Sequence, residues 1–172
     1  MTLDLLIIIL SLVLSAFFSG MEIAYVSSNK IHIEIEKKQA GLLSKLLSRI
    51  TAKPSKFIAT MLIGNNIALV IYGFYMGDVL VEWFATHLSP SSILVNELSL
   101  LSQTVVSTLV ILVTAEFLPK VFFQIYANSL LKLFAVPAYI FYMLFSLISA
   151  FVIWITDVVL KYIFKTAGDE VQ

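Results

Sequence analysis

Three short groups of polar residues interrupt apolar stretches of this chain, and their side chains carry oxygen ligands. The first group contains Ser15, Ser19 and Glu22, the second is GNN at 64–66, and the third is TAEFLPK at 114–120. Polar and ionisable side chains are costly in a bilayer, and those that occur there usually face the protein interior. Hydroxyl, amide and carboxylate oxygens suit Mg²⁺, Ca²⁺ or Na⁺ better than zinc or copper.

Each of the first two groups also has a plainer interpretation. Ser15 and Ser19 form an i,i+4 pair on one helix face, where small residues allow close helix packing. The adjacent Asn65 and Asn66 could form interhelical hydrogen bonds, which contribute only about 1 kcal/mol in membranes. Adjacent positions point about 100° apart on a helix, so both asparagines face one partner only if the helix breaks, for which Gly64 is suited.

The third group places a proline next to a carboxylate. Pro119 has no N–H to give to the carbonyl of Ala115, and its ring pushes that carbonyl away. A freed backbone oxygen would then lie beside Glu116. The alternative is an i,i+4 ion pair between Glu116 and Lys120 near the inner headgroups.

Taken together, the three groups could supply the six oxygen ligands that Mg²⁺ takes at about 2.0–2.1 Å. Broken helices that meet near the bilayer midplane are a recurring feature of transporters. The residue types alone do not choose among magnesium, calcium and sodium.

Composition excludes several other functions. The chain has no cysteine and two histidines, which excludes disulfides, thiol catalysis and cysteine-based metal sites. Its 11 basic and 11 acidic residues give zero net charge, and no basic stripe indicates nucleic acid. There is no H-E-x-x-H motif, nucleophile elbow or phosphate loop, so we do not expect an enzyme.

The elements that must position these groups are membrane spans. Hydrophobic residues make up 60% of the chain, against roughly 45–50% in soluble domains. Apolar runs long enough to cross a bilayer occupy 3–27, 54–78 and 101–126. The first run lacks a basic start and a small-residue cleavage site, so we interpret it as a retained span. The predicted fold class is an all-α integral membrane protein.

The distribution of Lys and Arg predicts the orientation. Seven of them lie between residues 30 and 56, and none lies in 1–29 or 78–103. The positive-inside rule then places the N-terminus outside and 30–56 in the cytoplasm. We expect helices on the inner surface over 29–50. The alternation KIHIEIE resembles a strand, but an isolated strand beside a bilayer is a poor solution.

A fourth apolar run, 133–163, is ambiguous. It is long enough to span, yet Lys132, Lys161 and Lys165 flank its two ends, and Pro137 and Asp157 interrupt it. It could span, lie at the inner interface as a belt, or be re-entrant. The polar segment 166–172 is interpreted as the start of a linker to a cytoplasmic region.

At the three polar groups the sequence resembles the CNNM/CorC family, the cyclin M and CorC-type magnesium transporters. The family's SGxExA segment is SGMEIA at 19–24, its IGNN segment is at 63–66, and its GExxPK segment is AEFLPK at 115–120. The three motifs occur in order, and the resemblance covers nearly the whole chain. Departures are Ala115 in place of glycine, and Met21 and Ile23 in place of smaller or polar residues.

The resemblance implies three spans per subunit plus a juxtamembrane belt, which favours the belt for 133–163. It implies a homodimer in the plasma or inner membrane, with a cytoplasmic nucleotide-binding CBS region after the membrane part. It also implies a largely dehydrated Mg²⁺ in each subunit, exported in exchange for Na⁺. The implied ligands are Ser19, Asn66 with Asn65 beside it, Glu116 and the carbonyl of Ala115.

The sequence therefore predicts magnesium transport across the cell membrane, by sodium-coupled export through an intramembrane oxygen site. The alternative is a magnesium-sensing or scaffolding membrane anchor that moves no ion.

Overall fold

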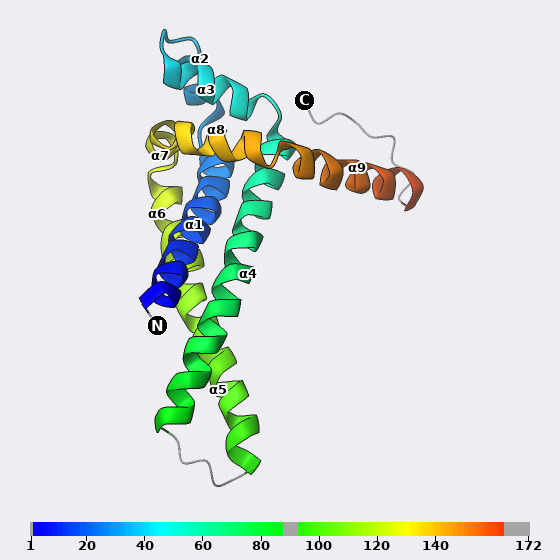
Figure 1. The fold of residues 1–172 in the computed structure, drawn as a ribbon. Helices are drawn as coiled ribbons and strands as arrows, with labels where there is room; N and C mark the ends of the chain where they lie inside the picture. Colours follow the sequence, from blue (N-terminus) through cyan, green and yellow to red (C-terminus); the bar gives the residue numbers. More distant parts are fainter. Residues whose placement is uncertain (1, 88–92, 164–172) are drawn as a thin grey trace.

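The chain is a helical bundle with a lateral arm. The computed structural model describes residues 2–87 and 93–163, and within these ranges it contains helices and no strand. Figure 1 shows α1, α4 and the α5–α6 segment running roughly side by side, with α2 and α3 at one end. The elements are α1 (Thr2–Ser27), α2 (Lys30–Lys37), α3 (Leu42–Thr51), α4 (Pro54–His87), α5 (Ile93–Ile111), η1 (Leu112–Phe117), α6 (Leu118–Ile125), α7 (Ala127–Leu133), α8 (Ala135–Leu144) and α9 (Ser146–Ile163).

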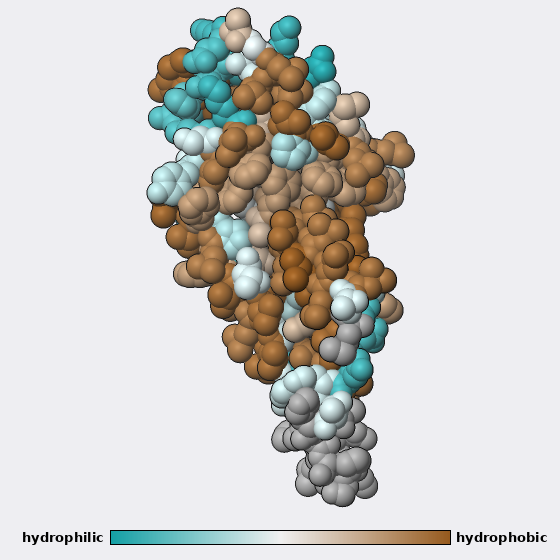
Figure 2. Space-filling model, turned by 60° about the vertical axis from the view of Figure 1, so that its left-hand side comes forward, coloured by the Kyte–Doolittle hydropathy of each residue, from teal (hydrophilic) through white to brown (hydrophobic). Residues whose placement is uncertain are grey.

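Three helical segments are long and apolar enough to cross a membrane, namely Thr2–Ser27, Pro54–Trp83 and Leu100–Ile125. This confirms the all-helical prediction with three candidate spans. Figure 2 shows a broad hydrophobic band between a hydrophilic end formed by α2 and α3 and a paler opposite end. The 34 residues of α4, at about 1.5 Å each, exceed the roughly 30 Å of a hydrocarbon core.

The two glycines in the polar groups allow close packing and do not break their helices. A Cβ at Gly64 would lie 2.6 Å from ring atoms of Phe18, and one at Gly20 would lie 2.5 Å from a ring carbon of Phe123. α1 and α4 run on without interruption through both positions. The break for which Gly64 was suited does not occur, and its missing side chain instead admits the Phe18 ring.

The segment that resembled a strand is helical, as expected. Asn29 caps α2 by accepting hydrogen bonds from the N–H groups of Ile31 and His32, which satisfies donors that have no partner within the helix. The α2–α3 pair is held to the bundle by an ion pair between Glu36 and Lys132 of α7, 2.5 Å long. That these helices lie on the inner membrane surface remains a prediction.

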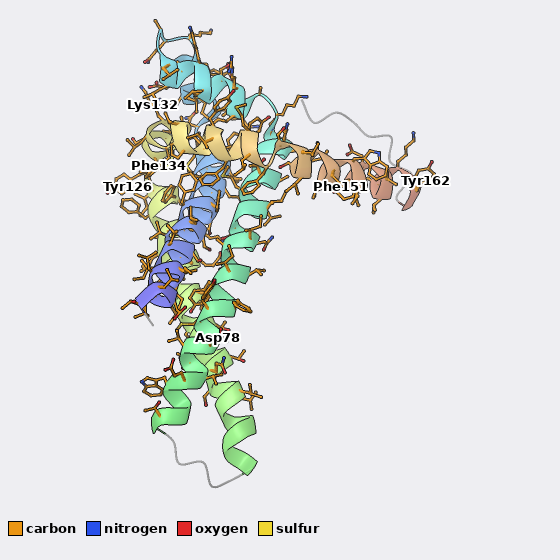
Figure 3. All side chains as sticks on the ribbon, in the orientation of Figure 1. Asp78, Tyr126, Lys132, Phe134, Phe151 and Tyr162 are labelled. Carbon is orange, nitrogen blue, oxygen red and sulfur yellow. The ribbon has the colours of Figure 1, made fainter. Side chains whose placement is uncertain are left out.

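The fourth apolar run is divided into short helices. The pair α7–α8 bends by 65° at Phe134, so the run begins with a corner. Figure 1 shows α8 and α9 crossing the ends of α1 and α4 and continuing beyond the bundle. Phe151 and Tyr162, labelled in Figure 3, lie on this projecting arm. The belt at the inner interface remains a prediction, and 166–172 lie outside the described residues.

The projecting arm is anchored to α4 by buried hydroxyls. The hydroxyls of Thr60 and Ser149, both fully buried, lie 2.8 Å apart. Ser149 also donates to the carbonyl of Phe145, and Lys56 donates to the Ser146 hydroxyl at 2.5 Å. Polar links of this kind fix the orientation of a helix that has few neighbours along the rest of its length.

We predict that Gly64→Ala destabilises the bundle although alanine is normally the better helix former by about 1 kcal/mol. The added methyl must push the Phe18 ring aside, and such overpacking costs about 1–3 kcal/mol. Gly73→Ala is the matched control, because nothing lies within 4 Å of a Cβ there. Thermal unfolding in detergent should show a lower midpoint for the Gly64 variant alone; equal or higher midpoints for both would contradict the close contact.

Candidate cation site

The Glu116 carboxylate is the point at which the three spans meet. From α4, Asn65 Nδ2 donates to Glu116 Oε1 at 3.0 Å, and from α1, Ser19 Oγ donates to Oε2 at 3.3 Å. Ser15 Oγ donates to Asn65 Oδ1 at 2.5 Å. These four side chains form a continuous hydrogen-bonded cluster inside a predominantly apolar bundle.

The cluster is well shielded. Ser15 and Ser19 are fully buried, and Asn65 is 7% exposed. The Glu116 side chain retains 22% exposure. Polar groups taken out of water are costly unless paired, so the hydrogen bonds restrict these side chains to a small set of arrangements.

Lys120 occupies the remaining side of the carboxylate. Its ammonium forms an i,i+4 ion pair with Glu116 Oε2, so the ion pair considered from the sequence is present. Glu22 lies close enough to interact electrostatically with both Lys120 and Glu116. The cluster therefore contains its own cation, and any bound ion must compete with an ammonium group for the same oxygen.

The third span departs from α-helical geometry at the carboxylate. Residues Leu112–Phe117 form a π-helical segment, and the N–H of Leu118 donates to the carbonyl of Val113. The next donor would be Pro119, to Thr114 in this register or to Ala115 in the α register. Proline has no N–H, so it can serve neither carbonyl. Single π turns inside α-helices occur frequently at functional sites.

The structure brings together most of the residues predicted from the sequence. Ser19, Asn65 and Glu116 are in the cluster, and Ala115 is fully buried in the π segment beside Glu116. Asn66, the favoured asparagine, is exposed on the outer surface of α4. Because α4 does not break, adjacent positions must diverge by about 100°, and only one asparagine can face the cluster.

The contribution of one residue to the cluster was undervalued from the sequence. Ser15 was interpreted as a packing residue, yet its hydroxyl contacts Asn65 directly; its i,i+4 spacing to Ser19 was the available signal.

Met21, which departs from the family pattern, belongs to the hydrophobic core and is fully buried. Among the described residues, no three His, Cys, Asp or Glu side chains gather as a metal cluster. The cluster instead combines one carboxylate with neutral oxygen donors.

Comparison with known proteins agrees with this architecture. Residues 5–171 match the family described as CNNM, the cyclin M transmembrane N-terminal domain. The chain is 24% identical over 155 residues to the UPF0053 inner membrane protein YfjD of Escherichia coli, covering 90% of this chain and 33% of that protein. It is 31% identical over 151 residues to the UPF0053 protein MG146 of Mycoplasma genitalium, covering 83% and 34%. A UPF0053 protein of Haemophilus influenzae is 26% identical over 165 residues, covering 95% and 35%.

The fold and the cluster define a multi-pass helical membrane domain with a polar site enclosed by its spans. The chain belongs to the CNNM family, as the match over nearly its whole length shows. It spans about a third of the length of the curated relatives that it matches.

The contrast between the two asparagines generates a stability prediction. Asn65→Leu should lower the free energy of unfolding by about 1–2 kcal/mol, because it removes the hydrogen-bond acceptor of the Ser15 hydroxyl and the donor to Glu116 Oε1. Asn66→Leu should be neutral or stabilising, since this position is exposed. Thermal unfolding of the two variants in the same detergent checks this, and equal losses would show that Asn66 has an unrecognised partner.

Proposed function

We propose that this domain carries Mg²⁺ across the cell membrane, as a sodium-coupled exporter, by way of the Glu116 cluster. The observation that carries the proposal is the convergence of a hydroxyl, an amide and a carboxylate group from the three spans on one point. The proposed ligands are Ser19, Asn65, Glu116 and the backbone oxygens of Thr114 and Ala115.

The donor set suits a hard cation. Its donors are oxygen, with neither sulfur nor imidazole among them, as Mg²⁺ prefers. The single carboxylate supplies charge, while hydroxyl, amide and carbonyl oxygens can replace part of the ion's water shell. The proline-terminated π turn supports this role, because a carbonyl without an N–H partner can turn toward a cation at little cost.

Cation binding requires two local rearrangements. Asn65 presents its NH₂ group to Glu116, so its amide must turn to present oxygen instead. Ser15 permits this turn, because a hydroxyl can donate to the amide oxygen or accept from the amide nitrogen. The Lys120 ammonium must also leave Glu116 Oε2, and we take Glu22, with which it interacts electrostatically, as its new partner.

A polar cleft supports a route away from the cluster. A cavity of about 190 Å³ lies between α4 and α5, lined by Gly73, Gly77, Gln103, Thr104, Ser107 and Thr108. It lies on the opposite side of the cluster from α2 and α3 along these two helices. By the distribution of Lys and Arg, this is the outward direction, which export would require.

A magnesium-sensing or scaffolding anchor is the second candidate. One observation favours it: the cluster is fully hydrogen-bonded, and Lys120 already neutralises Glu116. Such a site is satisfied without moving an ion. Saturable Mg²⁺ binding without flux would support the anchor.

We predict that Glu116→Gln abolishes saturable Mg²⁺ binding measured by calorimetry. Loss of a charged ligand should exceed the roughly 10–100-fold that loss of an outer-shell partner costs. Glu82→Gln, at an exposed position on α4, makes the same chemical change away from the cluster and should bind normally. In proteoliposomes with an imposed Na⁺ gradient, wild type and Glu82→Gln should move Mg²⁺. Equal binding by both variants would overturn the site, and binding without flux would overturn transport.

We also predict that Lys120→Met tightens Mg²⁺ binding about two- to fivefold, because a partly exposed i,i+4 ion pair contributes about 0.3–1 kcal/mol that the cation no longer has to replace. Lys45→Met, which removes an exposed lysine far from the cluster, is the control. Calorimetric titration under identical ionic conditions provides the comparison. Weaker binding in Lys120→Met than in the control would mean that the ammonium assists the bound state.

A further inference from the structure

Three cations converge beside α8, far from the Glu116 cluster. Arg49 lies on α3, Lys53 lies between α3 and α4, and Lys56 lies in the first turn of α4. Among the side chains that the structure describes, no carboxylate forms an ion pair with any of the three. Three unneutralised positive charges at neighbouring positions repel one another, so this surface attracts an anion.

Arg49 and Lys53 line a defined cleft, and Lys56 contacts Ser146 and Tyr142 of its lining. A cavity of about 430 Å³ between α3 and α8 is lined by Arg49, Ala52, Lys53, Tyr139, Tyr142, Met143 and Ser146. Its lining offers a guanidinium, an ammonium and three hydroxyls, and no carboxylate. That combination of donors suits a phosphate ester, to which arginine can bind in a bidentate manner.

Two of the cations are held in place by tyrosines on α8. Arg49 donates to the Tyr139 hydroxyl at 2.9 Å and lies 5.8 Å from the centre of that ring. Lys56 lies 5.1 Å from the centre of the Tyr142 ring while donating to Ser146. Side chains that are already ordered lose less conformational freedom when a ligand binds.

An exposed apolar stripe continues from the cleft along α8 and α9. Its members are strongly exposed: Ile140 58%, Met143 61%, Leu144 66%, Leu147 84% and Phe151 59%. A water-soluble phosphate bound in the cleft would make no contact with this apolar stripe. Acyl chains attached to the phosphate would cover it, so the joint pattern of cationic cleft and apolar stripe fits a phospholipid.

We propose that the cleft between α3 and α8 binds the phosphate headgroup of an anionic phospholipid, with the lipid's acyl chains lying against the α8–α9 stripe. The cleft is lined by residues of α3 and α8, and Figure 1 shows α8 at the end of the bundle that carries α2 and α3. The distribution of Lys and Arg predicts this end to be cytoplasmic. Anionic lipids are concentrated in that leaflet, and basic pockets at membrane-facing helices bind their headgroups. The bound lipid joins α3, α4 and α8 at the base of the arm.

Native mass spectrometry of the purified chain in detergent tests the proposal. Wild type should retain dioleoyl phosphatidylglycerol in preference to dioleoyl phosphatidylcholine, which has the same acyl chains and no net charge. Arg49→Gln with Lys53→Gln should weaken phosphatidylglycerol retention roughly 25-fold, since each basic residue near an anionic surface contributes about a fivefold gain. Lys38→Gln with Lys161→Gln removes two exposed charges that do not line the cleft and should change retention little.

Two further experiments distinguish a bound lipid from a soluble phosphate and test whether a loss of binding comes from misfolding. Glycerol 3-phosphate and inorganic phosphate should compete poorly with the lipid; competition at equal concentration would identify a soluble phosphate and overturn the lipid assignment. Arg49→Lys with Lys53→Arg, which conserves charge, should retain the preference. Equal loss in both double glutamine variants, or no preference in wild type, would also overturn the proposal. Unfolding midpoints confirm that each variant is folded.

Discussion

A carboxylate on an apolar span is the constraint on which much of this bundle depends. Glu116 lies among helices that offer few polar groups, and its desolvation must be offset by hydrogen bonds and opposite charge. Asn65, Ser19 and Lys120 provide these. Short side chains such as serine reach the carboxylate only if α1 lies very close to its neighbours. The polar cluster can therefore form only if the helices pack closely.

Gly20 and Gly64 allow the helices to approach this closely. The ring of Phe18 on α1 lies against the backbone of α4 at Gly64, and the ring of Phe123 on α6 lies against the backbone of α1 at Gly20. Each bulky ring is accommodated where the opposing helix has no side chain. The helices can then approach closely, and α1 and α4 need no break to do so.

Distortion is confined to the third span, where the carboxylate itself is located. The π segment ends at Phe117, two residues before Pro119, and loosens the backbone there. The helices α1 and α4 provide a regular framework around it. This division places adaptable backbone next to the group that carries charge. It also leaves the N-terminal end of α4 regular, where Lys56 and Thr60 connect the bundle to the α8–α9 arm through the hydroxyls of Ser146 and Ser149. The Glu116 cluster and the arm are thus joined by one continuous helix.

The sequence alone determined the features that depend on local composition. Runs of about 20 apolar residues predict spans because unpaired backbone is costly in hydrocarbon, and three such segments are present. The ordered polar motifs indicated the family. The helical state of 30–37 also followed, although its alternation was misleading taken by itself.

Tertiary structure decided the matters that depend on which face of a helix meets which neighbour. Hydropathy does not record helix rotation, so it could not choose between Asn65 and Asn66; an unbroken α4 turns one inward and leaves the other exposed. Gly64 had two possible uses, a break or a contact, and only the position of the Phe18 ring distinguishes them. Ser15 belongs to the cluster because α1 lies close enough to α4 for its hydroxyl to reach Asn65. The path of α8 and α9 was likewise set by polar contacts with α3 and α4 that no single segment reveals.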